Sequence, residues 1–291
     1  MGTARGSVGN GVHKPALSVL INVRRALPSL RPAEQRVAHA VLADPAGISE
    51  SSITAVARMC DTSETTVLRF CRAIGLAGYP ELRIALARAA QFEETDHGGG
   101  PPLNGTISAT DGLADVVAKI AHADARAIED TAATLDLNAL KGAIDALMNA
   151  ARIDIYGVGA SGLVGHFLHQ KLHRIGLISF IATETQLALT SAELLGPSDV
   201  ALGITHSGVT TAVIDALQVA RRRGATTIAV TNYDRSPVAT QSDLILTTAA
   251  RETTFRSGSM ASRITQLAVV DCLFAGVAQR AYDASIAALP S

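Results

Sequence analysis

Five short apolar stretches separated by amphipathic stretches dominate the second half of the sequence. The apolar stretches cover residues 152–157, 178–183, 200–205, 226–231 and 243–248, and most recur at intervals of roughly 20–27 residues. Residues 162–175, 185–195 and 209–223 lie between them and carry apolar side chains at helical spacing. A strand, a crossover helix and a second strand need this spacing, and the two strands then run parallel. The sequence therefore predicts an α/β domain with a five-stranded, parallel, doubly wound sheet.

A segment rich in glycine and proline divides the chain. FEETDHGGGPPLNGTISATDG, residues 92–112, has too few apolar side chains to fold and is predicted to be a linker. Upstream, proline, hydroxyl and glycine residues bound four helices over 32–42, 53–60, 64–74 and 80–90. We therefore expect a disordered N-terminus over 1–16, an all-α domain over 17–91 and the α/β domain over 113–291, which begins with helices at 113–132 and 137–150.

Residues 53–75 follow the pattern of a helix-turn-helix, with a short helix, a three-residue turn and a second helix. Asp61 takes the turn position where glycine is commonest, and aspartate tolerates the left-handed backbone there. Ser63 is expected to cap the second helix. The first residues of such a helix meet base edges in the major groove of DNA. We therefore expect Glu64, Thr65 and Thr66 to read bases.

Basic side chains are concentrated in the same part of the chain. Residues 13–91 contain ten Lys or Arg against six Asp or Glu, a net charge of about +4, whereas the whole chain carries −1. Arg69 and Arg72 lie on the outward face of the second predicted helix and suit phosphate contacts. The alternative is a plain helical bundle whose arginines form a solvated face. Aromatic residues make up only 3% of the chain, which disfavours a stacking single-strand binder. The expected nucleic-acid partner is double-stranded DNA.

Cysteine usage and hydropathy indicate the compartment. Cys60, Cys71 and Cys272 are odd in number and widely spaced, so we expect reduced thiols that mostly fill the core. No apolar run approaches the ~18 residues of a membrane span. These features predict a cytoplasmic protein without a membrane partner.

Two polar, glycine-containing loops follow the first and third predicted strands. The first is GVGASG, with Gly159 and Ser161, and the second is THSGVT. In a sheet of order 2-1-3-4-5, strands 1 and 3 are neighbours whose chains leave toward opposite faces, and their carboxyl ends form the ligand crevice. Each loop leads into a helix whose first amides can donate to an anion. The second loop adds the hydroxyl or glycine residues Thr205, Ser207, Gly208 and Thr210, so a small phosphate monoester is the predicted ligand. The simpler alternative is that these hydroxyls only cap the following helix.

Other ligands and activities compete for this edge. GVGASG also matches G-x-G-x-x-G, and Glu184 ends the second strand where a ribose-binding acid would lie, so an NAD(H)-sensing regulator is one alternative. A sugar-phosphate isomerase is another, because Glu184, His206 and Glu252 are acid–base candidates near the edge, although nothing in the sequence pairs them. His206 could equally contact a bound ligand or point to solvent.

His166, His169 and His173 recur at i, i+3 and i+7 on one predicted helix, a spacing that can bind a metal. They lie opposite the apolar side chains of that helix. We therefore interpret them as an exposed polar face and predict no metal site.

At this point the sequence resembles a known family. GVGAS and THSGVT are similar to the G-x-G-x-S and S-x-S-G-x-T motifs of SIS (sugar isomerase) domains. A helix-turn-helix domain ahead of such a domain resembles the RpiR family of bacterial transcriptional regulators. SETTVLRFCRAIGLAGYPELR (63–83) and SGSMASRITQLAVVDCLF (257–274) are similar to characteristic segments of that family. Thr205 replaces the usual serine but keeps the hydroxyl. The similarity extends over nearly the whole chain from about Leu27.

The resemblance implies a regulator, a repressor, whose SIS fold binds a phosphorylated sugar and whose helix-turn-helix binds a DNA operator. It further implies a homodimer or homotetramer, no catalytic activity and no cofactor.

Overall fold

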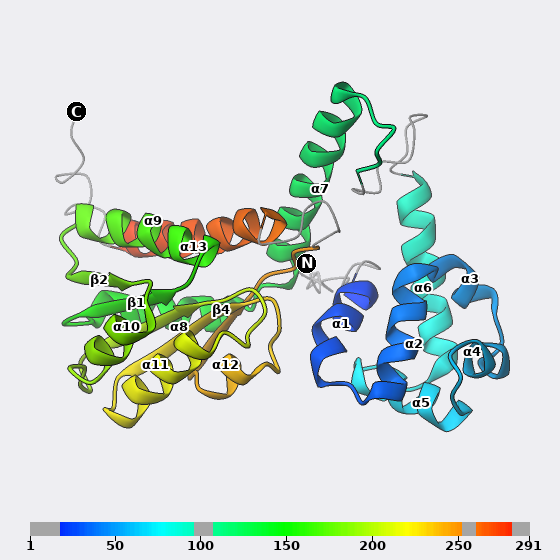
Figure 1. Ribbon diagram of the computed structural model, residues 1–291, viewed down its shortest axis with the longest axis horizontal. Coiled ribbons are helices and arrows are strands. Elements are labelled where there is room, and N and C mark those ends of the chain that lie inside the picture. Colours follow the sequence, from blue (N-terminus) through cyan, green and yellow to red (C-terminus); the bar gives the residue numbers. More distant parts are fainter. Residues whose placement is uncertain (1–17, 96–106, 252–259, 281–291) are drawn as a thin grey trace, which may run out of the picture. The chain divides into compact units, whose positions relative to one another are not determined.

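The computed structural model describes residues 18–95, 107–251 and 260–280 (Figure 1). Contacts divide the chain into two units, one of Met1–Arg24 and Pro32–Asp96, the other of Arg25–Arg31 and His97–Ser291. The expected disordered N-terminus and residues 96–106 of the expected linker lie outside the described residues. We describe each unit separately.

The first unit is helical. It contains most of α1 (Ser18–Ala26), then α2 (Pro32–Ala43), α3 (Pro45–Glu50), α4 (Ile53–Met59), α5 (Glu64–Ala73) and α6 (Tyr79–Thr95). The end of α1 and the 3₁₀ turn at Leu27–Ser29 belong to the second unit. The sequence pattern missed α1 and α3. Asp44 and Pro45 were interpreted only as a helix end, but Asp44 also caps α3, because its carboxylate accepts from the Gly47 amide at 2.9 Å. In addition, α6 continues four residues into the expected linker, since QFEET contains good helix formers.

The second unit contains a parallel five-stranded sheet of order β2-β1-β3-β4-β5. The strands are β1 (Ile153–Gly157), β2 (Ser179–Ala182), β3 (Val200–Ile204), β4 (Thr226–Thr231) and β5 (Leu244–Thr247), as the sequence predicts to within two residues. Every residue of β1 and β3 is buried, which accounts for their continuous apolar sequences.

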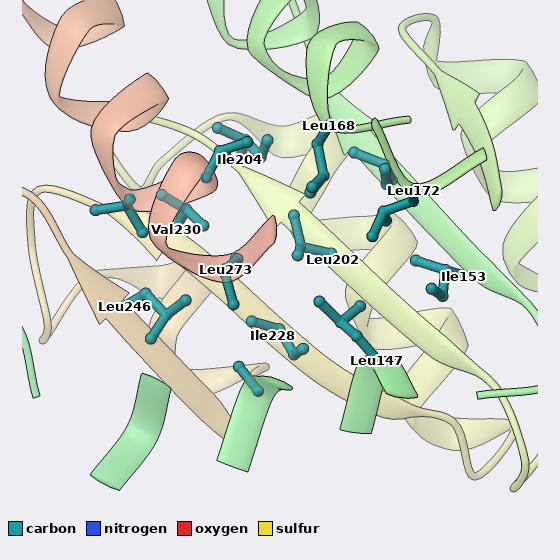
Figure 2. Packing of buried hydrophobic residues seen from close by; sticks show 14 of the residues in the cluster. Leu147, Ile153, Leu168, Leu172, Leu202, Ile204, Ile228, Val230, Leu246 and Leu273 are labelled. Carbon is teal, nitrogen blue, oxygen red and sulfur yellow. The ribbon is translucent and has the colours of Figure 1, made fainter. Parts of the chain in front are cut away.

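Helices cover both faces of the sheet (Figure 1). α8 (Leu137–Asn149), α9 (Ala160–Arg174) and α13 (Met260–Arg280) lie on one face, and α10 (Thr185–Ala192), α11 (Thr211–Arg222) and the short α12 (Pro237–Thr240) lie on the other. Figure 2 shows the first core, in which Leu168 of α9 and Leu273 of α13 pack over Leu202 of β3. A second apolar core, between the sheet and α10, α11 and α12, covers the other face. The strands that carry the loops are therefore packed on both faces.

In the second unit, α7 (Leu113–Thr134) precedes the sheet, and its buried residues all lie in its last eight positions. Two contacts fix this end to the segment that follows β5. The Thr131 hydroxyl accepts from the Ala249 amide at 3.0 Å, and Arg251 forms a 2.9 Å ion pair with Asp130. At the other end Leu113 is 87% exposed. The printed contacts of α7 with the segment after β5 are therefore at its C-terminal end, and its first residues are exposed.

Within the part of the chain that the structure describes, one helix segment, Ala261–Arg280, is long and apolar enough to pass a membrane-span test by length and composition. Val269, Val270, Leu273 and Val277 of this segment lie in the first core, on the sheet. Its hydropathy is therefore explained by packing inside the domain.

Candidate functional site

The helix-turn-helix of the first unit consists of α4, a turn at residues 60–63 and α5. Asp61 has a φ of 47°, the left-handed conformation that its position in the turn predicts. Ser63 caps α5, since its hydroxyl accepts from the Thr66 amide at 3.3 Å. Val67, Phe70 and Cys71 are buried, so the opposite side of α5 is left for a partner.

The residues expected to read bases differ in their contacts within the unit. The Glu64 carboxylate accepts from the Thr54 hydroxyl at 2.6 Å, and the Thr66 hydroxyl lies 3.1 Å from that of Ser63. Both side chains therefore stabilise the start of α5. Thr65 is exposed and its side chain makes no hydrogen bond to the described residues.

Arginines occupy two different roles in this unit. Arg69 and Arg72 are exposed on α5 and have no hydrogen bond or ion pair with the described residues. Arg36 of α2, which the sequence analysis counted only as part of the basic excess, donates to the carbonyls of Cys60 and Asp61 at 2.8 and 2.6 Å. Arg36 therefore fixes the turn, whereas the α5 arginines leave a cationic surface.

The cysteines are free thiols. Cys60 and Cys71 are buried beside the turn and in α5, and burial raises the pKa of Cys71 to about 11. They fill the core as expected, whereas Cys272 of α13 is exposed.

In the second unit, the two polar loops leave neighbouring strands at one edge of the sheet. β1 pairs directly with β3, and Gly157 and Ile204 are partners at the last position of the ladder. The first loop leads into α9 on one face and the second leads toward α11 on the other. This is the topological switch point of a doubly wound sheet, where such folds bind ligands.

The first loop is a tight turn. Gly159 has a φ of 61° and precedes α9. A β-carbon on Gly157 or Gly162 would lie 2.9 Å from the backbone oxygen of Ser161 or Gly157, so both positions require glycine. Ser161 is 7% exposed, and its Oγ lies 3.2 Å from Oε1 and 3.1 Å from Nε2 of Gln266 on α13.

The second loop brings its own hydroxyls together. The Oγ1 atoms of Thr205 and Thr210 are 2.7 Å apart, and Thr205 is buried. The Ser207 hydroxyl accepts from the Val209 amide at 3.3 Å. Gly208 has a φ of 70° and packs against Ser236. The Thr210 side chain makes no cap on α11, so helix capping alone does not account for this hydroxyl.

The acid–base candidates lie apart from these contacts. Glu184 is exposed at the end of β2, where it precedes α10 without capping it. His206 is half-buried, and its ring centroid lies 5.8 Å from that of Tyr233. Glu252 lies outside the described residues. No hydrogen bond joins Glu184 to His206 within the described ranges.

The α9 histidines are only partly as expected. His166 and His173 are exposed, but His169 is half-buried and its Nδ1 lies 2.9 Å from the Ser179 hydroxyl on β2. Burial is the main cause that lowers the pKa of His169, followed by the charges of His173 and His166. The described residues hold no group of three or more His, Cys, Asp or Glu side chains placed for a metal.

Two buried amides at the site edge were not singled out from the sequence. Gln266 contacts Ser161, as described above. Asn232, at the end of β4, accepts from the Thr248 hydroxyl at 2.9 Å and from the Ala250 amide at 2.8 Å, and so fixes the segment after β5. An amide at an otherwise apolar helical position was the available signal for Gln266.

Comparison with known proteins agrees with this architecture. Residues 17–93 match the model of the rpiR-family helix-turn-helix domain, and residues 146–276 match that of the SIS domain. An uncharacterized HTH-type transcriptional regulator of Caldanaerobacter subterraneus is 41% identical over 265 residues, 91% of this chain and 92% of that protein.

Two solved structures are similar as well. NanR of Vibrio vulnificus, complexed with ManNAc-6P, has a TM-score of 0.57 and 28% identity, over 92% of this chain and 96% of that chain. The sugar isomerase domain of an RpiR transcription factor from Sphaerobacter thermophilus has a TM-score of 0.55 and 26% identity, over 60% and 95%. One unit contains a helix-turn-helix, and the other has two polar loops at the topological switch point of its sheet. The chain belongs to the RpiR family of HTH-type transcriptional regulators, with an N-terminal helix-turn-helix domain and a C-terminal SIS domain.

Proposed function

We propose that the SIS domain binds a phosphorylated sugar between the ends of β1 and β3, and that this binding changes the affinity of the helix-turn-helix for its operator. The observation that carries the proposal is the pairing of Gly157 with Ile204, since it brings two hydroxyl-bearing loops to neighbouring positions at one sheet edge. The similarity to a NanR structure complexed with ManNAc-6P supports a ligand of this class.

The phosphate is proposed to lie against the hydroxyls of Ser161, Ser207 and Thr210 and the first amides of α9 and α11. Helix N-termini donate to anions and carry partial positive charge, so a lysine is not required. Thr205 would orient Thr210 through their 2.7 Å contact.

The glycines and the remaining side chains of the site have separate proposed roles. Gly159 and Gly208 would let the backbone approach the phosphate. Glu184 and His206 would contact sugar hydroxyls, and Glu252 is proposed to join them.

For DNA, we propose that Thr65 contacts a base edge and that Arg69 and Arg72 contact phosphates. Their exposure on one side of α5 supports this assignment. Ser63, Glu64 and Thr66 contribute chiefly by holding the start of the helix, given their contacts within the unit.

A ligand can change DNA binding only by its differential affinity for two states of the protein, a coupling of typically ~1–3 kcal/mol. The first test is a thermal-shift panel of phosphorylated sugars that starts with ManNAc-6P, with the unphosphorylated sugars as controls. We expect a shift with at least one sugar phosphate. Ser207→Ala is expected to abolish it, whereas Ser198→Ala, an exposed serine at the opposite edge, is the matched control. DNA binding that responds to none of the panel would refute the sensing role.

We propose that the domain is not an enzyme, which the similarity to proteins named HTH-type transcriptional regulators supports. An isomerase needs an acid and a base at the reacting carbons. The purified protein is expected to leave an aldose phosphate unchanged. Turnover would support the isomerase alternative, and saturable NADH binding that survives Ser161→Ala would support the dinucleotide alternative.

Assembly, direction of regulation and compartment are further parts of the proposal. Exposed apolar side chains on the second unit, among them Leu163, Ile178 and Leu187, support a homodimer or homotetramer. Light scattering of the full chain distinguishes these states from a monomer. We propose repression of sugar-metabolism genes in the cytoplasm, which a reporter assay in the presence and absence of the gene would test.

A further inference from the structure

Gln266 occupies a position on α13 that the helical pattern assigns to the core. Val269, Val270 and Leu273 follow it at i+3, i+4 and i+7, and all three are completely buried in the core against the sheet. Gln266 itself is 1% exposed. Burying an amide costs free energy unless its polar atoms are hydrogen-bonded, so an apolar residue would be the simpler choice here.

Within the described ranges, the hydrogen bonds of the Gln266 side chain go to Ser161 alone. The two residues are far apart in sequence, and the contact joins α13 to the first turn of α9. The nearby Thr265 hydroxyl donates to the Ser262 carbonyl at 2.9 Å on its own helix, so it does not compete for the amide. The buried amide of Gln266 therefore hydrogen-bonds Ser161.

The geometry allows two arrangements of hydrogen. The Ser161 Oγ lies 3.2 Å from Oε1 and 3.1 Å from Nε2, so the hydroxyl can donate to the first atom or accept from the second. When it accepts from Nε2, its single hydrogen is free to point elsewhere. The exchange needs rotation of the hydroxyl hydrogen and no movement of heavy atoms.

We propose that Gln266 is a positioning residue of the ligand site. Its Nε2 donates a hydrogen bond to the Ser161 oxygen, so the Ser161 hydroxyl can donate its own hydrogen bond to a bound phosphate. This inference rests on the proposed function and adds to it a residue from the last helix of the domain. Hydrogen bonds in a chain polarise one another, so donation from the amide strengthens the bond that Ser161 makes to an anion. Without ligand, the same hydroxyl is free to turn back and donate to Oε1.

The chemistry requires an amide, because a carboxylate of the same shape has no donor. In Gln266→Glu the ionised carboxylate would accept the hydrogen bond of the Ser161 hydroxyl, and its negative charge would repel an anion. Protonation gives the carboxyl group one donor, and burial raises the pKa of such a group toward the accessible range. Binding lost at pH 7.5 is therefore expected to return in part at pH 5.

The test measures the affinity of the full chain for inorganic phosphate by calorimetry, and repeats the pH series with sulfate, which stays a dianion. We expect Gln266→Met, which keeps the volume, to weaken phosphate binding about fivefold, as the loss of one neutral hydrogen bond does. Gln266→Glu is expected to weaken binding at least ~10-fold at pH 7.5, as a lost charge-assisted bond does. The matched control is Gln279→Met, at an exposed position of the same helix, with wild-type affinity expected.

A double-mutant cycle separates positioning from general support of the fold. If Gln266 acts through Ser161, Gln266→Met causes no further loss in a Ser161→Ala background. Independent, multiplying losses, or wild-type affinity in Gln266→Met, would overturn the inference while leaving the proposed function intact. Absence of phosphate and sulfate binding by the wild type, with no shift in the sugar-phosphate panel, would overturn both. Should Gln266→Glu not fold, Gln266→Met and the cycle decide the question.

Discussion

Replacing Gly208 by alanine is expected to damage the second loop of the SIS domain more than replacing any glycine that only ends a helix. Gly208 has a φ of 70°, and the position of a β-carbon there would be 2.1 Å from Oγ and 2.3 Å from Cβ of Ser236. Ser236 is 1% exposed and its hydroxyl donates to the Tyr233 carbonyl at 2.6 Å. Rotating the hydroxyl away cannot relieve the overlap, because Cβ is fixed by the backbone.

Two costs add in this variant. The left-handed conformation costs an alanine roughly 1–2 kcal/mol. Forcing the loop and Ser236 apart by about an ångström is overpacking, which typically costs about 1–3 kcal/mol. The free energy of unfolding is therefore expected to fall by roughly 2–5 kcal/mol. Ligand binding should weaken as well, because the Ser207 and Thr210 hydroxyls flank the displaced residue.

The matched control is Gly176→Ala, which isolates the backbone cost. Gly176 has a φ of 85°, and a β-carbon there meets nothing within 4 Å. Urea denaturation of both variants, followed by circular dichroism, compares the transition of the second unit. A loss in Gly208→Ala that equals the loss in Gly176→Ala would show that contact with Ser236 has no energetic weight, and would refute the described packing of the loop.

Further predictions concern the helix-turn-helix unit and a histidine of α9. Arg69→Ala is expected to weaken DNA binding at all sequences and to lower the slope of log K against log salt by about 0.9; an unchanged slope in a salt titration would move the recognition surface elsewhere. Thr65→Ala should instead relax preference at particular bases, measured by competition between operator variants. Arg36→Ala removes two bonds to the turn and should lower the free energy of unfolding of the first unit by roughly 1–2 kcal/mol, which Arg36→Lys does not restore because an ammonium lacks the planar fork. His169 has a lowered pKa, so below about pH 6.5 the unfolded state takes up its proton first and stability falls; His169→Gln should flatten this part of a pH series between 7 and 5.

The fold followed from the sequence because its determinants are local and periodic. β1 and β3 are continuous apolar runs that end in glycine or hydroxyl residues, and their spacing leaves room for one crossover helix. α3 was missed for a different reason. α3 is six residues long and begins at Asp44 and Pro45, which end one helix and start the next, so periodicity had too few positions to register.

Of the candidate site, only the contacts within a single loop could be predicted from the sequence. Thr205 and Thr210 are close in sequence, and the contact between their hydroxyls follows from one turn. The contact of Ser161 with Gln266 joins residues that are more than a hundred positions apart, and a single sequence holds no signal for such a pair. The sequence also holds no signal for the contact of Glu64 with Thr54 on the preceding helix. Charge and position predict Glu64 as a base-reading residue, and only the tertiary structure shows that its carboxylate also accepts from Thr54.

The exposed start of α7 means that a small rotation of this helix displaces its N-terminal end by a larger distance. About 14 residues separate Leu113 from the first buried position, Ala127, which is about 21 Å of helix. If the end held by Thr131 and Asp130 tilts by about 5°, the free end sweeps through about 2 Å. Both contacts go to residues just after β5, Ala249 and Arg251, and Asn232 holds their neighbours Thr248 and Ala250 at the carboxyl edge of the sheet. A slight rearrangement at this edge therefore displaces the start of α7 by more than it displaces the residues around Thr131.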